Sequence, residues 1–228
     1  MKIKTTLIAA LSLLTSLNAG AAVAQWQAAI NTGSATAAKN FTTITTPVLF
    51  DVGALTGDRS FEFIFNAAAG VTPSSALLGT FAVEGGRQAL KFEQWNKTGF
   101  FGATAFGVAD YTSTVSAPSG VDTQAVFTYD GTKTDLYLNG VFKATILGAT
   151  DAALALTGLQ GLGGAHNAGA YVDPLQGSIF GFASYDSVLS PAEIASHYAA
   201  FSAVPETGST ALLGLAVMGT CLRRRRGV

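Results

Sequence analysis

Short apolar runs alternate with turn residues through the middle of the chain, roughly every 8 to 14 residues, a spacing typical of a β-sandwich. In the run 60–66, Phe61, Phe63 and Phe65 share one face and Glu62 and Ile64 share the other, because side chains alternate along a strand. The phenylalanine face is expected to be core. The pattern predicts an all-β domain with strands over 48–52, 60–66, 77–83, 89–94 and 121–129.

A β-hairpin is predicted over 135–144. Asn139-Gly140 lies between two alternating apolar segments, and this dipeptide favours the tight turn that joins antiparallel strands. Asp130-Gly131 bends the preceding run into the same hairpin, which predicts a three-stranded meander.

The stretch 154–169 is rich in glycine and poor in strand signal, which predicts a long loop crossing a sheet. Its segment GLGGAH, 161–166, has neither a preceding strand nor a following helix in the sequence pattern. A dinucleotide fingerprint needs both. Phosphate binding is therefore not expected here.

A short helix is predicted after residue 190. Ser190 suits an N-cap, Pro191 the first helical position, and Glu193 the matching position of a capping box. Apolar residues follow at helical spacing and are expected to pack on the sandwich: Ile194, Tyr198 and Phe201.

The N-terminus has the three parts of a secretory signal peptide. Lys2 and Lys4 precede an apolar run over 5–17, and Ala22-Val23-Ala24 forms a small-x-small cleavage site. We expect cleavage after Ala24, with cleavage after Ala21 as the alternative. The signal peptide is therefore assigned to residues 1–24, and a single domain to 25–203.

The C-terminus has an uncharged run over 210–222, followed at once by Arg223, Arg224, Arg225 and Arg226. This run is short for a spanning helix, which needs about 20 apolar residues. The arginines are expected to stop transfer and to keep the end of the chain cytoplasmic. Together with the signal peptide, this short transmembrane helix places the domain outside the cell.

The last 25 residues, 204–228, resemble the PEP-CTERM sorting tails of Gram-negative bacteria. Val204, Pro205 and Glu206 match the motif, and an apolar helix and an arginine cluster follow it. Thr207 departs from it and makes VPETG similar to the LPxTG motif of Gram-positive sortase substrates. The resemblance implies an exosortase-type sorting protease as a partner and a transient membrane anchor. Sortase processing and an ordinary single-span anchor are the alternatives.

Charge becomes informative once the ends are set aside. Six of the 13 Lys and Arg residues lie at the two termini. The part between the two apolar runs therefore has seven basic residues and all 14 acidic residues, and its formal charge is 7 − 14 = −7. This acidic balance argues against nucleic acid as a partner. The single cysteine, Cys221, lies in the C-terminal run, so the domain must fold without disulfides.

Three segments resemble laminin-G-like, concanavalin A-like domains: YDGTKTDLYLNGV at 129–141, LKFEQWNKTGFFGATAFGVADY at 90–111, and GSIFGFASYDSVLSPAEIASHYAAF at 177–201. The likeness covers about 48–201. It implies a jelly-roll β-sandwich whose last strand, over 177–185, leads into a short closing helix. The resemblance does not identify a ligand.

The sequence argues against catalysis. The resembled superfamily includes glucanases, and retaining glycosidases need two carboxylates about 5–5.5 Å apart. Only Glu62 has another acidic residue, Asp58, within five positions, and the glutamates outside the signal peptide form no closely spaced pair: Glu62, Glu84, Glu93, Glu193 and Glu206. A pair drawn from separate strands, Glu62 with Glu93, is the remaining option. His166 and His197 have no serine or cysteine motif nearby, and His197 is expected to be packed or at the surface.

The resemblance also implies a calcium site, because many domains of this kind hold one calcium at a sheet rim through oxygen ligands. Asp110, Asp122 and Asp173 lie in predicted loops and are the candidate ligands. The alternative is that they are ordinary turn aspartates.

Trp95, Phe101 and Tyr111 lie in or beside a stretch that contains glycine and asparagine, and they are the candidate sugar-stacking residues. Phe100 and Phe101 are adjacent, so one of the two must point away from the core. The alternative is that these aromatic side chains belong to the core.

These observations predict an exported, non-catalytic binding module of the cell surface or extracellular matrix that associates with exopolysaccharide or another surface glycan. The alternatives are a divergent glycan hydrolase or lyase, and a structural matrix protein without a small ligand.

Overall fold

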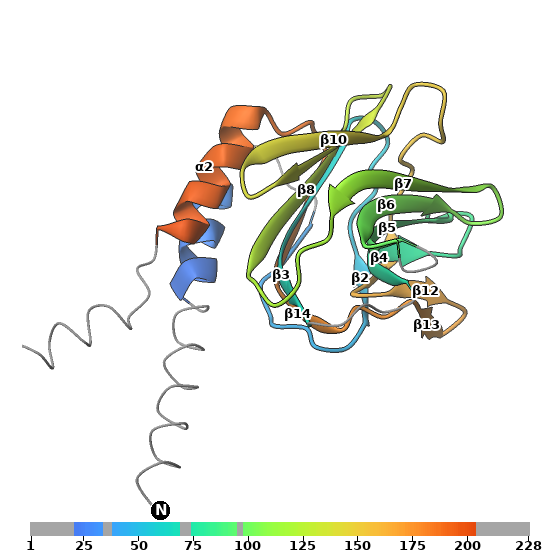
Figure 1. Ribbon diagram of the computed structural model, residues 1–228, viewed down its shortest axis with the longest axis horizontal. Helices are drawn as coiled ribbons and strands as arrows, with labels where there is room; N and C mark the ends of the chain where they lie inside the picture. The colour runs from blue at the N-terminus through green and yellow to red at the C-terminus, as the bar shows by residue number, and fades with distance from the viewer. Residues whose placement is uncertain (1–20, 34–37, 69–73, 95–97, 204–228) are drawn as a thin grey trace, which may run out of the picture.

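The computed structural model describes residues 21–33, 38–68, 74–94 and 98–203, which form a two-layer β-sandwich (Figure 1). The first sheet has the order β1 (Ala38–Asn40), β14 (Gly177–Tyr185), β3 (Arg59–Ala67), β8 (Thr123–Tyr129), β9 (Thr134–Leu138) and β10 (Val141–Leu147). The second sheet has the order β13 (Ala170–Val172), β12 (Ala165–Asn167), β4 (Ser75–Thr80), β5 (Gln88–Glu93), β6 (Phe100–Ala105) and β7 (Ala109–Ser116). β11 (Leu159–Leu162) joins it through β4 and pairs with β2 (Val48–Asp51). The predicted all-β sandwich is confirmed.

The core lies between the two sheets and is built on phenylalanine. Phe61, Phe63 and Phe65 of β3 are fully buried on the face that the sequence predicted. Phe65 meets Phe92 of β5 edge to face, with ring centroids 5.6 Å apart. Burying a phenylalanine stabilises the fold by roughly 1.5–3 kcal/mol, so these contacts hold the sheets together without disulfides.

The hairpin and the meander are confirmed. Asn139 and Gly140 have φ values of 51° and 78°, as a type I′ turn requires, and they join β9 to β10. β8, β9 and β10 are neighbours in the first sheet. A Cβ atom on Gly140 would lie 3.3 Å from Ala195 and Tyr198, so the turn sits directly beneath the closing helix.

The prediction of a long loop over 154–169 is wrong in part, because β11 and β12 lie within it. The glycines permit close approach of backbones rather than flexibility. A Cβ atom on Gly161 would lie 2.2 Å from the carbonyl oxygen of Gly164. β11 pairs with β2 on one side and β4 on the other, so glycine here marks a crowded strand.

The closing helix α2 (Pro191–Ser202) is confirmed together with its cap. The Ser190 hydroxyl accepts from the Glu193 backbone N–H, and the Glu193 side chain accepts from the Ser190 N–H. Ile194, His197 and Phe201 are the buried residues of the helix. They pack on the outer face of the first sheet, which places α2 on the side away from the second sheet (Figure 1).

Replacing Ser190 with alanine is expected to lower the free energy of unfolding by about 1 kcal/mol, because the first turn of α2 loses its capping acceptor. Urea denaturation of the variant measures this loss. The control is Ser202→Ala at the exposed end of the same helix, which should change stability by less than about 0.5 kcal/mol. Equal effects of the two changes would contradict a capping role.

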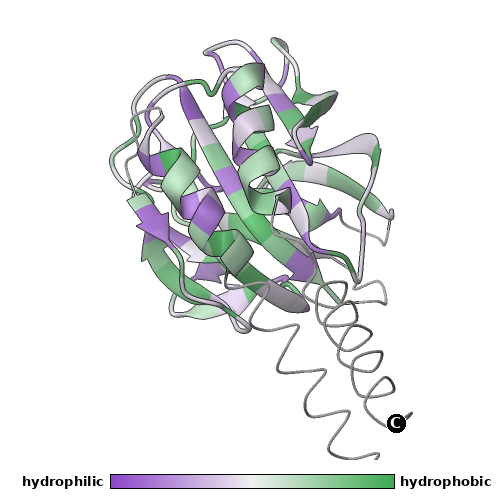
Figure 2. Cartoon of the chain, turned by 90° about the vertical axis from the view of Figure 1, so that its left-hand side faces the viewer, coloured by the Kyte–Doolittle hydropathy of each residue, from purple (hydrophilic) through white to green (hydrophobic). Residues whose placement is uncertain are grey.

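A second helical segment, residues 21–31, lies beside α2 on the same face of the first sheet (Figure 2). Ala22, Val23, Trp26 and Ile30 are buried in it, at the spacing of one helical face. The signal peptide predicted over 1–24 ends inside this helix, because the expected boundary after Ala24 divides residues 21–31. None of the helices among the described residues is long and apolar enough to cross a membrane. The tail, 204–228, lies outside the described residues.

A buried polar cluster joins both helices to the first sheet. We call it the Glu62 cluster: Trp26, Glu62, Gln124, Tyr185 and His197. Glu62 Oε1 accepts from Trp26 Nε1 and from Gln124 Nε2, each at 2.7 Å. Glu62 Oε2 accepts from the Tyr185 hydroxyl at 2.7 Å and lies 3.0 Å from His197 Nδ1. Burial, and then the Glu62 charge, raise the pKa of Tyr185, so its hydroxyl stays protonated as a donor.

Candidate ligand-binding pocket

The outer face of the second sheet is hollowed because small residues occupy it. Lys91 of β5 is paired across the sheet with Ala76 of β4 and Gly102 of β6. Ala76 and Ala89 are fully buried on this face. The hollow forms a pocket of about 430 Å³, within the usual range for small-ligand sites.

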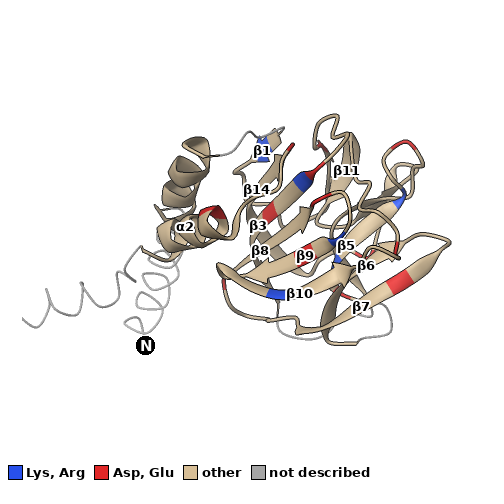
Figure 3. Ribbon diagram, turned by 90° about the horizontal axis from the view of Figure 1, so that it is seen from above, with Lys and Arg blue, Asp and Glu red and all other residues tan. Residues whose placement is uncertain are grey.

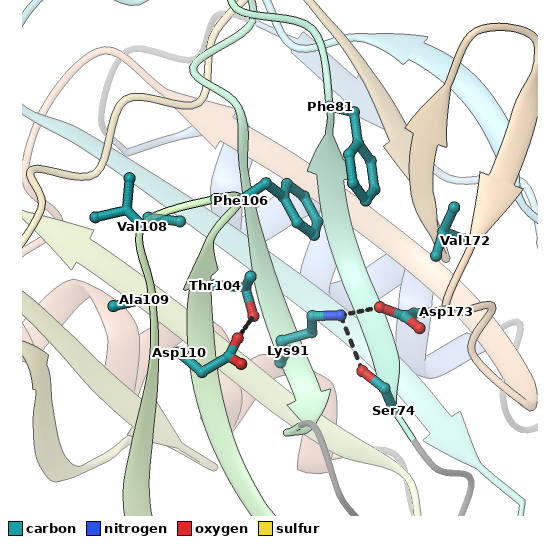
Figure 4. Close-up of a pocket in the computed structure, with 12 residues that line it drawn as sticks. Ser74, Phe81, Lys91, Thr104, Phe106, Val108, Ala109, Asp110, Val172 and Asp173 are labelled. Atoms are coloured by element: carbon teal, nitrogen blue, oxygen red, sulfur yellow. Dashed lines mark hydrogen bonds and ion pairs between the residues drawn. The ribbon is translucent and has the colours of Figure 1, made fainter.

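Two phenylalanines form one wall of the pocket. Phe81 follows β4 and Phe106 follows β6, and their rings stack with centroids 3.7 Å apart and planes 18° apart (Figure 4). Both side chains are half-buried and pack over the small residues of the face. The wall therefore presents apolar ring surface beside polar groups, a combination typical of small-ligand pockets.

Lys91 lies on the pocket floor and is held by two partners. Its ammonium forms an ion pair with Asp173 and donates to the Ser74 hydroxyl at 2.9 Å (Figure 4). Nζ also lies 5.8 Å from the centroid of the Phe106 ring. A serine beside a lysine can be a nucleophile and its base. Here Asp173 binds the Lys91 side chain as an ion pair, so we interpret the contact between Lys91 and Ser74 as structural.

Asp110 is the other carboxylate of the pocket, and it is exposed. It lies opposite Thr104 across the β6–β7 ladder, and its Oδ1 accepts from the Thr104 hydroxyl at 2.7 Å. Gln94 Nε2 lies 3.3 Å from the same oxygen. Thr104 and Gln94 are buried, so two fixed donors orient a carboxylate that faces solvent.

The three candidate calcium ligands do not come together. Asp110 and Asp173 line the pocket, but Asp173 is paired with Lys91 and Asp110 with Thr104. Asp122 precedes β8 of the other sheet and accepts from Asn66. Within the described ranges, no group of three or more His, Cys, Asp or Glu side chains could hold a metal ion.

The candidate aromatic residues lie elsewhere than expected. Phe101 is fully buried in the core, so its assignment to sugar binding is corrected: the β6 register points it at the other sheet. Phe100 is the half-buried member of the adjacent pair. Tyr111 is half-buried and packs against the same core. Trp95 lies outside the described residues.

The remaining option for a catalytic pair, Glu62 with Glu93, is also corrected. Glu62 alternates with the core phenylalanines of β3 and points to the outer face of the first sheet, inside the Glu62 cluster. Glu93 alternates with Phe92 on β5 of the second sheet and accepts from the Gly99 N–H at 2.6 Å. The sandwich core separates the two carboxylates.

The pocket residues left a partial signal in the sequence. Alternation along 89–94 places Lys91 on the face away from Leu90 and Phe92, which the structure bears out. Phe81 and Phe106 stand at strand ends separated by 25 positions, and no local pattern predicts that such residues stack. Only the pairing of β4 with β5 and β5 with β6 brings them together.

Comparison with known proteins agrees with this architecture. A family model for the Concanavalin A-like lectin/glucanases superfamily matches residues 38–195, well over half of the chain. The chain therefore belongs to this superfamily, and the laminin-G-like resemblance is confirmed.

Solved structures share the fold at low identity. The CBM40 domain of the Ruminococcus gnavus IT-sialidase, bound to alpha2,6 sialyllactose, aligns with a TM-score of 0.53 and 18% identity, over 72% of this chain and 99% of that one. The NanB sialidase from Streptococcus pneumoniae aligns with a TM-score of 0.52 and 14% identity, over 71% of this chain but 28% of the sialidase. No curated protein sequence matches this chain. These likenesses establish the fold alone.

Proposed function

We propose that the protein is a non-catalytic glycan-binding module of the cell surface or extracellular matrix, and that its pocket on the second sheet binds polysaccharide. The observation that carries the proposal is the pocket itself. It combines a stacked aromatic wall with an oriented, exposed carboxylate on a concanavalin A-like sandwich. The CBM40 domain with sialyllactose bound supports it, because a sandwich of this fold can carry a glycan site.

The absence of catalysis is part of the proposal. Glu62 and Glu93 lie on opposite sides of the sandwich, and Lys91 forms an ion pair with Asp173. Glycoside hydrolysis needs two nearby carboxylates. We therefore expect no release of reducing ends when the purified protein is incubated with polysaccharides that it binds.

We further propose that the protein is exported and transiently anchored. The support is in the sequence: the signal peptide, the motif Val204-Pro205-Glu206 and the arginine cluster Arg223–Arg226. An exosortase-type protease is the expected sorting partner. In the sequence the tail follows α2, which lies on the outer face of the first sheet (Figure 1). The residues that line the pocket belong to the second sheet. Attachment through the tail would therefore leave the pocket facing away from the anchor.

A glycan array that includes the host's own exopolysaccharide tests the binding function. It is run in calcium and in excess EDTA, so that the same experiment tests the calcium site for which the sequence offered Asp110, Asp122 and Asp173 as candidate ligands. Binding to at least one polysaccharide is expected. Silence across the array would overturn the glycan-binding function and favour a structural matrix protein.

Replacing Phe106 with leucine is expected to weaken glycan binding by about threefold to tenfold, because an aromatic contact contributes roughly 0.5–1.5 kcal/mol beyond its buried area. Titration calorimetry with the best array ligand measures the change. Phe142→Leu is the matched control, since Phe142 is an exposed phenylalanine on β10 of the other sheet. Equal affinities for the two variants would show that the aromatic wall is not the binding surface.

A further inference from the structure

The charges that line the pocket come from Lys91, Asp110 and Asp173, so its formal charge is 1 − 2 = −1. The cation is not available to a ligand. Lys91 is 2% exposed, and its ammonium is already bound to Asp173 and Ser74. An acidic sugar that entered the pocket would therefore meet no free positive charge among the lining residues.

Asp110, unlike Lys91, is exposed to solvent, and hydrogen bonds from neighbouring side chains fix the direction of its carboxylate. Thr104 and Gln94 donate to its Oδ1, whereas Oδ2 has no hydrogen-bond partner among the described residues. A carboxylate accepts strongly from hydroxyl and ammonium donors. Since buried groups fix its direction, Asp110 need not give up much rotational freedom when a ligand binds.

We propose that the pocket takes a sugar that carries no acidic group, and that Asp110 binds this sugar by accepting from its hydroxyl or ammonium groups. This inference rests on the glycan-binding function proposed above. A neutral or amino sugar offers donors to Asp110 and an apolar ring face to Phe106 and Phe81. A uronic or sialic acid would place a second negative charge beside Asp110, and like charges brought together disfavour binding.

Figure 3 shows the Lys and Arg positions of the described residues dispersed along the ribbon rather than gathered at one place. Among the described residues, Arg87 is an exposed cation beside the pocket rim, with Nη2 3.5 Å from where a Cβ atom on Gly107 would lie. An acidic sugar would have to rely on this side chain. Arg87→Gln therefore separates the two sugar classes, since binding of a neutral sugar should be unchanged by it.

The experiment compares the purified full chain with three probe sets: neutral hexasaccharides of glucose, mannose, galactose and arabinose, the glucosamine hexamer, and hexamers of mannuronate and galacturonate. Binding to a neutral or amino probe is expected, with none to the acidic probes. Asp110→Asn should weaken it at least about tenfold, since it removes a hydrogen bond to a charged group. Asp122→Asn is the matched control, because Asp122 is also exposed and also bonded to a side chain, on the other sheet.

Thr104→Val keeps the shape of a buried residue while it removes the hydroxyl that orients Asp110. It should weaken binding by a smaller factor, about threefold to tenfold, so the inference does not depend on one variant folding well. Preference for the acidic probes, or affinity unchanged in Asp110→Asn, would overturn the inference and leave the glycan-binding function standing. Failure of all probes and of the glycan array would overturn both.

Discussion

Replacing Trp26 with alanine is expected to lower the free energy of unfolding by about 3–5 kcal/mol, the usual cost of truncating a fully buried tryptophan. Trp26 is completely buried on the outer face of the first sheet. It lies over Gly181 of β14, where a Cβ atom would come within 2.3 Å of the indole ring. It also packs edge to face on Phe41 and donates to Glu62. Urea or thermal denaturation of the purified protein measures the loss.

The effect is specific to the buried face of the segment 21–31. Gln25 is exposed on the same helix, so Gln25→Ala should change stability by less than about 0.5 kcal/mol. A loss below about 1 kcal/mol in Trp26→Ala would show that the segment is not docked in solution. Both expected cleavage positions, after Ala21 and after Ala24, leave Trp26 and Ile30 in the exported chain, so processing and this packing are compatible.

The sequence predicts this fold well where local chemistry decides the structure. Alternation identified the core face of β3, the positive φ values needed at Asn139 and Gly140 identified the hairpin, and the capping box at Ser190 identified α2. It failed where glycine serves close packing, because Gly161 looks like a loop residue until its strand neighbours are known. It also did not predict helix 21–31, because residues 21–24 were assigned to the end of the signal peptide and no helix was expected after them.

The candidate site was predictable only in part, for a related reason. Asp110 and Asp173 were singled out as calcium ligands, and both line the pocket, but each has a partner that comes from another strand. Phe101 was singled out as an exposed aromatic, and the register of β6 turned it into the core. Alternation predicts which side chains of a strand share a face. It does not predict which of the two faces is buried, because this depends on how the strand pairs with segments that are distant in the sequence.

Removing the Glu62 side chain is expected to cost about as much as removing Trp26. Glu62→Ala should lower the free energy of unfolding by about 3–5 kcal/mol, the usual effect of removing one partner from a buried charged network. Glu62 is completely buried, and its loss would leave the indole N–H of Trp26 and the hydroxyl of Tyr185 without an acceptor. Each unsatisfied buried donor costs about 1–3 kcal/mol. Equilibrium denaturation checks the total.

Three further changes separate the polar network from simple loss of volume. Glu62→Gln keeps the side-chain volume but turns one acceptor into a donor, so its loss should be smaller, about 1–3 kcal/mol. Glu84→Ala, at an exposed turn residue, should be nearly neutral. Trp26→Phe removes the indole N–H that Glu62 accepts from. Combined with Glu62→Ala, it should therefore cost less than the sum of the two single changes. Strict additivity would mean that Trp26 is held by packing alone, whereas coupling would show that Glu62 joins the N-terminal helix and α2 to the sheet opposite the pocket.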